Sequence, residues 1–193
     1  LFGSLFGGTP RSAADVVFDE RTGEFRVGNA WSRRGGSIEA ARNLATSAAG
    51  TLNGVLNLIG GQLVNGASVT GGTYGLRKSD YTYRDAPSIT RNGRDVDRIF
   101  SGDDGAADLL NHGVYNALLG FEIAGGDVFL KRALNSVLAL NSNSSEFTTE
   151  LVIGDLTIAQ DYSNYFRNPD FFNTLIVSTA GSAYSGGFAV TLV

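Results

Sequence analysis

The feature that constrains this chain most is an apolar stripe at helical spacing in residues 37–61. Its members recur at steps of three and four residues, which places them on one face of an α-helix. They are Ile38, Ala41, Leu44 or Ala45, Ala48, Leu52, Val55 or Leu56, and Ile59. Ser37 is a suitable N-cap, and Glu39 complements the positive end of the helix dipole. Gly60 and Gly61 supply a left-handed stop, so we predict an amphipathic helix of about 22 residues.

This helix allows two interpretations of its packing. An ordinary core helix buries such a stripe against its own domain. The first half of the stripe is mostly alanine, however, and small side chains also permit close contact with a symmetry-related copy. In the second interpretation, this half and the opening Leu-Phe-Gly repeat of residues 1–8 lie at a symmetry axis.

The composition limits the classes of function. Of 193 residues, 42% are hydrophobic, and the charged fraction of 18% is below the usual quarter. With 26 glycines, so weakly charged a chain suggests that much of its surface lies against other protein. A net charge of −4 does not favour stable nucleic-acid binding. The lack of cysteine excludes disulfides, thiolate metal sites and cysteine nucleophiles.

Two antiparallel hairpins are predicted on either side of the helix. Residues 16–19 and 24–27 are rich in β-formers and flank a loop ending in glycine. Residues 73–78 and 81–84 alternate large and polar side chains around a turn. We expect Tyr74, Tyr81 and Tyr83 to form a cross-strand aromatic cluster there rather than a ligand site.

Further local signals complete the first half of the chain. Asn65-Gly66 predicts a tight turn that joins strands at 62–64 and 67–70. The single tryptophan, Trp31, is interpreted as a core anchor. Residues 89–102 are expected to be irregular, with Ile99 and Phe100 turned inward.

The second half is predicted to be helical. One helix begins after Asp103 or Asp104 and continues to about residue 123, and another is capped by Asp127 and ends near residue 140. Residues 141–145 form a polar linker. A third helix covers residues 150–166 with a break at Gly154-Asp155, and a last one follows Asn168-Pro169-Asp170 at 171–178. The end of the chain, at 184–193, is apolar and has no assigned structure.

Together these elements predict an α+β fold, mainly helical, with several amphipathic helices and short antiparallel β-hairpins. We divide the chain into a linker at 1–15, an α+β domain at 16–140 and a helical C-terminal extension at 141–193. Since the sequence contains no methionine, we expect a processed or partial chain with a helical segment upstream of residue 1.

No residue is assigned to catalysis, cofactor binding or metal binding. His112, the only histidine, has no G-x-S-x-G nucleophile to serve. Glu24, Glu39 and Glu122 could form a glycosidase carboxylate pair, but no motif supports one. Asp95, Asp97, Asp103 and Asp104 cluster without the spacing of a calcium loop, so we favour helix capping for the last two. The middle of the chain is basic and could face an acidic partner or DNA, through Arg33, Arg34, Arg77, Lys78, Arg84, Arg91, Arg94 and Arg98.

The order of these elements resembles the C-terminal domain of tail tape measure proteins from long-tailed bacteriophages and gene transfer agents. The resemblance covers roughly residues 16–192 and depends on order rather than on one motif. The matching pieces are Gly23-Glu24-Phe25-Arg26-Val27-Gly28, Leu52-Asn53, Gly60-Gly61, Gly75-Leu76-Arg77-Lys78 with Tyr81, Gly126-Asp127, Lys131-Arg132-Ala133-Leu134 and Ile158-Ala159-Gln160-Asp161-Tyr162. Residues 181–193 depart most, being richer in glycine than that family pattern.

The resemblance implies a structural virion protein rather than an enzyme. It would be the C-terminal anchor of the tape measure protein in the tail tip and hub, at the distal end of the tail lumen, and would take part in tail length determination, tail assembly and DNA ejection. Implied partners are two further copies in a homotrimer, the hub and distal tail proteins, and the tail tube. A tail-tip peptidoglycan hydrolase module and a protein that contacts the host membrane during ejection are the alternatives. No apolar run approaches the roughly 18 residues that span a bilayer, so membrane action would need several copies.

Overall fold

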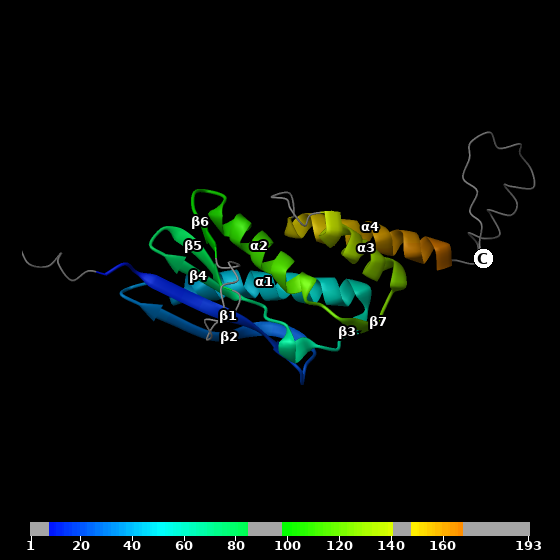
Figure 1. Cartoon of the computed structure of the whole chain (residues 1–193), viewed down its shortest axis with the longest axis horizontal. Helices are drawn as coiled ribbons and strands as arrows, with labels where there is room; N and C mark the ends of the chain where they lie inside the picture. The colour runs from blue at the N-terminus through cyan, green and yellow to red at the C-terminus, as the bar shows by residue number, and fades with distance from the viewer. Residues whose placement is uncertain (1–7, 85–97, 141–147, 168–193) are drawn as a thin grey trace, which may run out of the picture.

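A computed structural model describes residues 8–84, 98–140 and 148–167. In this part of the chain a layer of helices covers one face of an antiparallel sheet (Figure 1). The strands are β1 (Arg11–Asp19), β2 (Glu24–Arg33), β3 (Gly61–Leu63), β4 (Thr73–Arg77), β5 (Asp80–Arg84), β6 (Arg98–Phe100) and β7 (Ile123–Gly125). The helices are α1 (Ile38–Ile59), the short 3-10 turn η1 (Gly66–Ser68), α2 (Gly105–Leu119), α3 (Val128–Leu140) and α4 (Thr149–Arg167).

The main sheet has five strands in the order β2-β1-β4-β5-β6, and every neighbouring pair is antiparallel. Both predicted hairpins are confirmed as β1–β2 and β4–β5. A separate two-stranded sheet joins β3 to β7. In Figure 1 this small sheet and the α3–α4 pair lie toward the opposite end of the molecule from β5 and β6.

The prediction of a mainly helical fold is wrong. The described part is an α+β structure about 49% helical, and its sheet is a full layer rather than a set of short hairpins. β6 and β7 escaped prediction because each has three residues and gains its hydrogen bonds from a distant strand. Strands that short carry little periodicity of their own.

Helix α1 begins and ends where the sequence predicts. The Ser37 hydroxyl accepts a hydrogen bond from the backbone N–H of Ala40 at 3.1 Å. Glu39 lies in the first turn, and Gly60 closes the helix with a φ of 68°. The alanine half is not available to a symmetry-related copy, because Ala41, Ala45 and Ala48 are fully buried in the chain's own core. The apolar stripe of α1 is therefore packed in the chain's own core, as the ordinary core-helix interpretation predicts.

One core unites the sheet with all four helices. The largest side chains that it buries come from every layer, namely Tyr74, Tyr83, Leu52, Ile59, Leu109, Leu118, Leu130 and Leu156. β1 begins at Arg11, so residues 11–15 belong to the sheet rather than to the linker expected there. α4 packs on α3 and α1 and adds Val152 and Leu156 to the same core.

The Asn65-Gly66 hairpin is a wrong prediction. β3 pairs with β7, about 60 residues later in the chain, and Gly66 begins η1. The Asn65 side chain explains the difference because it donates to the Gly120 carbonyl at 2.8 Å and accepts from the Glu122 N–H at 3.1 Å. It therefore tethers the segment after α2 instead of closing a local turn.

Helices α2, α3 and α4 agree with their predicted boundaries to different degrees. α2 ends at Leu119 rather than near residue 123, because Gly120 stops it and Ile123 enters β7. α3 matches its prediction, and Asp127 accepts from the N–H groups of Phe129 and Leu130. α4 is continuous through Gly154, so the predicted break is wrong.

Several predictions fall outside the described residues. They are the linker at 141–145, the restart at 168–170, the helix at 171–178, the apolar end, the opening repeat before residue 8, and the side chains of Arg91, Arg94, Asp95 and Asp97.

Candidate interaction surface

The side chains of the main sheet alternate between two faces. Ala14, Val16 and Tyr74 point toward the helices and are buried in the core. Their neighbours along the strands therefore point to the other face, which no described helix covers. We call this second side the outer face.

Strand register places three arginines side by side at one end of the outer face. Arg11 is paired with Arg33 of β2 and with Arg77 of β4. All three side chains are exposed, and neighbouring strands lie only about 4.8 Å apart. Like charges directly opposite each other destabilise a sheet, but Asp80 of β5 lies opposite Arg77 in the same row and offsets part of this repulsion.

The next row combines large side chains at the sheet edges with small ones in the middle. Trp31, Ala13, Gly75, Thr82 and Ile99 are register partners across β2, β1, β4, β5 and β6. Trp31 is 44% exposed and Ile99 is 59% exposed. The small central residues leave a hollow of about 530 Å³ whose walls include both of these side chains.

Two of these positions contradict the sequence prediction. Trp31 is not a core anchor, and Ile99 is not turned inward, whereas Phe100 packs against the core as expected. The reason is parity along the strands. Ile99 pairs with Thr82, whose neighbours Tyr81 and Tyr83 take the inner positions, and Trp31 pairs with Ala13 on the outer face.

The third row is Asp15, Thr73 and Arg84. Asp15 is only 7% exposed, and its carboxylate accepts a hydrogen bond from the Thr73 hydroxyl at 3.0 Å. Burial raises the pKa of Asp15, and the bond from Thr73 opposes this shift without cancelling it. Arg84 is exposed at the same end of the hollow, and Arg98 lines its edge.

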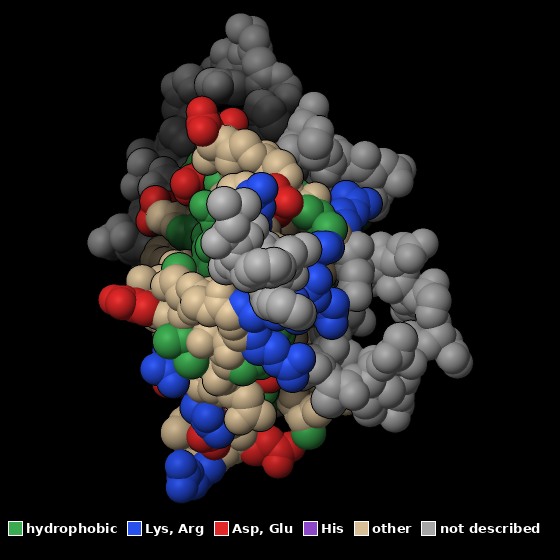
Figure 2. All heavy atoms as spheres, turned by 90° about the vertical axis from the view of Figure 1, so that its left-hand side faces the viewer, with side chains coloured by type: hydrophobic (Ala, Val, Ile, Leu, Met, Phe, Trp, Pro, Cys, Tyr) green, Lys and Arg blue, Asp and Glu red, His purple; other side chains and the backbone are tan. Residues whose placement is uncertain are grey.

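The three rows of the outer face carry four arginines, Arg11, Arg33, Arg77 and Arg84, and two acids, Asp15 and Asp80, so their side chains are net basic in a chain whose net charge is negative. Figure 2 shows one group of Lys and Arg side chains right of centre, while other basic and acidic side chains are scattered over the rest of the view. Among the described residues, Asp19 forms ion pairs with Arg21 and Arg26. The guanidinium of Arg33 lies 5.5 Å from the centre of the Trp31 ring. Arg11 and Arg33 are exposed on this face and accessible to a partner, whereas Arg77 lies opposite Asp80.

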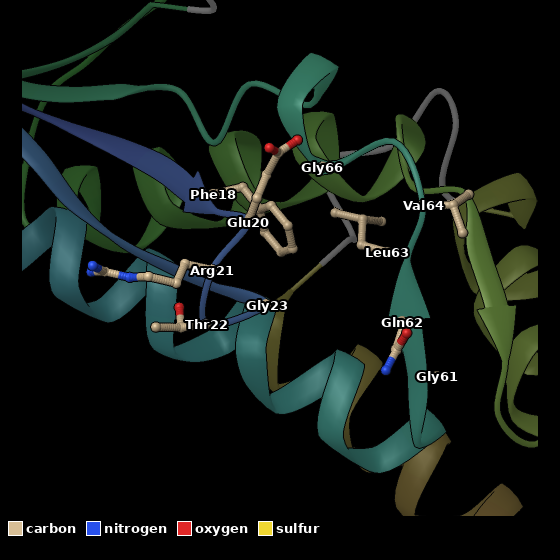
Figure 3. A pocket seen from close by; sticks show the side chains of 10 residues that line it. All are labelled: Phe18, Glu20, Arg21, Thr22, Gly23, Gly61, Gln62, Leu63, Val64 and Gly66. Carbon is tan, nitrogen blue, oxygen red and sulfur yellow. The ribbon is translucent and has the colours of Figure 1, made fainter.

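A second hollow, of about 450 Å³, lies between the β1–β2 turn and β3. In Figure 3, Phe18 and Leu63 face each other across it, whereas the Arg21 side chain points away. Glu20, Thr22 and Gln62 are exposed around its rim. The arrangement brings no acid–base pair or nucleophile together, so it offers no evident chemistry.

The residues weighed for catalysis lie apart. His112 of α2 packs edge-on against the Tyr83 ring at 5.0 Å and lies near Asn116. Glu39 starts α1, while Glu24 and Glu122 are exposed on β2 and before β7. Asp104 occupies the N-cap position of α2 as predicted, although its side chain makes no capping bond.

The aromatic cluster predicted for the β4–β5 hairpin is present in the core. The rings of Tyr74 and Tyr83 meet edge-to-face at 5.5 Å. The Tyr74 hydroxyl is buried against Gly113 of α2, and desolvation raises the pKa of Tyr74 well above its usual value. This position supports a structural role for the cluster.

The arginine row was missed because two of its members were assigned to loops or hairpin ends. Its signal lay in the register, since a β1–β2 pairing through residue 11 brings Arg11 opposite Arg33. Among the described residues, no group of three or more His, Asp or Glu could hold a metal ion. None of the described helices is long and apolar enough to cross a membrane. Comparison with family models, curated proteins and solved structures finds no match to this chain.

Proposed function

We propose that this chain is a structural virion component, the C-terminal anchor of a tail tape measure protein, held in the tail tip by protein–protein contacts. The observation that carries the proposal is the outer face of the sheet. It combines the exposed arginines Arg11, Arg33 and Arg77 with exposed Trp31 and Ile99, and Trp and Arg are the residue types enriched at protein interfaces.

The physical demands of an anchor fit this surface. An anchor in a tail must hold during assembly and let go when DNA leaves. Contacts made mainly by charged groups at a wet surface are weaker and more sensitive to conditions than a large apolar interface. The core behind the outer face is continuous from the sheet to α4, which gives the surface a rigid support.

Location in the particle tests the proposal. Tailed particles purified from the source culture are examined by immunogold electron microscopy with an antibody against the chain, before and after triggered DNA release. Before DNA release, we expect label at the distal end of tails whose tip has been opened to the antibody. After release, we expect the chain to be absent from the particles. Absence of the chain from purified tailed particles, or its location in the capsid, would overturn the proposal.

Activity measurements test the two alternative functions, a peptidoglycan hydrolase and a membrane-active protein. Purified chain is incubated with cell-wall sacculi and with dye-loaded vesicles. Release of sugar or peptide that is lost in Glu24→Gln would favour the hydrolase alternative, and dye leakage would favour the membrane alternative. Neither is expected.

A further inference from the structure

One edge of the main sheet is open along the second half of β2. In the strand order β2-β1-β4-β5-β6, β2 has a neighbouring strand on one side only. At the start of β2 the free side is closed by α1, because the side-chain amide of Asn53 bonds to both backbone groups of Phe25. Near the other end of the strand, residues 29 and 31–33 are exposed. This second part, at residues 29–33, is called the open edge below.

The strand register shows which backbone groups point to the open side. The N–H of Val16 donates to the Gly72 carbonyl at 2.9 Å, so the even-numbered residues of β1 bond toward β4. The odd-numbered residues of β1 therefore bond to β2, where Trp31 is among their partners. Since bonding directions alternate along a strand, the N–H and C=O groups of Ala30 and Ser32 point away from β1. Among the described residues, no hydrogen bond to these four groups is found.

The turn after β2 leaves this edge accessible. The N–H of Gly36 donates to the Arg33 carbonyl at 3.1 Å, and Gly36 lies against the backbone of Arg11 at the start of β1. The chain therefore turns back toward β1 before α1 begins. It does not run alongside Ala30 and Ser32, so an extended segment has room to pair there.

Basic side chains stand on both sides of the open edge. On the outer face, Arg33 is exposed. On the helical side, exposed Arg42 precedes Asn53 by eleven residues, which is about three turns, so the two side chains point to the same side of α1. Eleven residues of helix span roughly 16 Å, and the five residue steps from Phe25 to Ala30 cover a similar length of strand. Arg42 is therefore level with the open edge.

The carboxylates of this region offset its positive charge only in part. The exposed arginines around the end of β2 are Arg11, Arg33, Arg34 and Arg42. Glu39 is the single acid of α1. On the outer face, the carboxylate of Asp15 accepts a hydrogen bond from Thr73 of β4, and Asp80 of β5 stands opposite Arg77. The open edge thus combines unpaired backbone groups with a local excess of positive charge.

We propose that the open edge of β2 accepts an extended, acidic segment of a partner protein as a sixth strand of the main sheet. The backbone of this segment bonds to Ala30 and Ser32. Its carboxylates face Arg33 on the outer face and Arg42 on the helical side, and Trp31 packs against a side chain between them. Strand addition of this kind takes affinity from the main chain and selectivity from alternate side chains. The inference rests on the proposed function, because it names the kind of partner that would hold the anchor.

Two other occupants fit the open edge less well. Pairing of β2 with β2 of a second copy would bring two sets of the same arginines together, and like-charge juxtaposition opposes such a contact. The phosphates of nucleic acid accept hydrogen bonds but do not donate them, so they would leave the carbonyls of Ala30 and Ser32 without partners. An acidic polypeptide satisfies both the charge and the hydrogen-bond pattern.

Two blocked octapeptides test the inference with the whole 193-residue chain. One consists of two Glu-Glu-Val-Val repeats, which place acids on both faces of an extended peptide, and the other has lysine in place of glutamate. Trp31 is the only tryptophan and lies on the open edge, so its fluorescence reports binding directly. We expect a saturable change with the glutamate peptide and a dissociation constant at least about tenfold higher for the lysine peptide. Salt should weaken the binding of the glutamate peptide.

Substitutions at Ser32 separate strand pairing from surface charge. Ser32→Pro removes an N–H that points to the open side and leaves the ladder with β1 intact, whereas Ser32→Ala keeps this N–H. The dissociation constant of the glutamate peptide should rise at least about tenfold in Ser32→Pro and stay nearly unchanged in Ser32→Ala. Arg33→Glu should weaken binding by a similar factor, and Arg132→Glu, an exposed arginine of α3, should not. Far-ultraviolet circular dichroism checks that each variant is folded.

Equal binding of the two peptides, or equal binding to Ser32→Pro and Ser32→Ala, would overturn the inference. A dimer of the chain without peptide that Ser32→Pro dissociates would assign the open edge to a second copy instead. Binding of single-stranded oligothymidylate that survives in Ser32→Pro, together with no peptide binding, would favour nucleic acid. These measurements use purified chain and peptides, so their failure is distinguishable from absence of the chain from tailed particles.

Discussion

Asn53 shows how one polar side chain of a helix can satisfy the backbone hydrogen-bonding groups at the edge of a sheet. Its Oδ1 accepts from the backbone N–H of Phe25 at 2.7 Å, and its Nδ2 donates to the Phe25 carbonyl at 2.9 Å. These two bonds reproduce what a neighbouring strand would supply to β2. They also attach α1 to the strand whose Phe25 ring enters the core.

We predict that Asn53→Ala lowers the free energy of unfolding by about 1–3 kcal/mol, because two partly buried backbone groups lose their partners. Urea denaturation followed by circular dichroism measures the change. Asn57→Ala, an exposed position of the same helix, is the control and should change stability by less than about 0.5 kcal/mol. Equal effects of the two substitutions would contradict the role given to Asn53.

Asp15 and Asp19, on the same strand, should respond to pH in opposite directions. Burial raises the pKa of Asp15 above its usual 3.8, so the folded state holds this proton more tightly than the unfolded state does. Stability from this group is therefore full below pH 3.8 and falls as the pH rises through the raised pKa. Asp15→Asn keeps an acceptor for Thr73 and should raise the urea midpoint at neutral pH, with the gain vanishing in acid.

Asp19 supplies the matched comparison. The backbone N–H of Arg21, followed by the Arg26 side chain, lowers the pKa of Asp19. Its contribution is therefore present above pH 3.8 and is lost as the pH falls through the lowered pKa. Asp19→Asn should lower the urea midpoint at neutral pH. A loss of stability in Asp15→Asn at neutral pH would mean that its charge is compensated in the folded state.

At the scale of the element, two helical glycines distinguish the effect of side-chain contact from the effect of helix propensity. Gly113 of α2 lies against Tyr74, and a Cβ there would overlap the tyrosine ring and hydroxyl. Gly50 of α1 is exposed and has no atom near its would-be Cβ. Both glycines weaken their helices in the same way, so alanine substitution differs only in what the new methyl group meets.

We predict that Gly113→Ala destabilises the protein by about 1–3 kcal/mol through overpacking, whereas Gly50→Ala stabilises it by up to about 1 kcal/mol. Tyr74→Phe removes the hydroxyl and should restore part of the loss in the double variant. Thermal and urea unfolding of the wild type, Gly50→Ala, Gly113→Ala and the Gly113→Ala/Tyr74→Phe double variant provide the measurement. Full tolerance of Gly113→Ala would show that α2 can move away from β4 at little cost.

Elements with a local cause were predictable from the sequence. α1 has a stripe, a cap and a stop within its own residues, and the β4–β5 hairpin has alternation and a turn. The elements that were not predicted depend on residues that lie far away in the sequence. β7 exists because β3 is beside it, and Asn65 binds Gly120 and Glu122 rather than its neighbours. The arginine row was missed for the same reason, since only the strand order brings Arg11 between Arg33 and Arg77.

On the scale of the whole molecule, the sheet and the C-terminal helices share one core. Leu156 of α4 is fully buried in the cluster that also holds Leu52 of α1 and Tyr74 of β4. A shared core predicts one cooperative unfolding transition rather than separate melting of α4. The position of Trp31 on the sheet, far along the chain from α4, gives an optical probe of this coupling.

We predict that Leu156→Ala lowers the free energy of unfolding by about 2–5 kcal/mol, because the lost side chain leaves a cavity in this core. The transition seen by Trp31 fluorescence should move together with the one seen by circular dichroism at the helical band. Ile158→Ala, two residues away and exposed, should leave both transitions of the isolated chain nearly unchanged. If Leu156→Ala shifted only the helical signal and left the tryptophan transition in place, α4 would unfold as an independent unit.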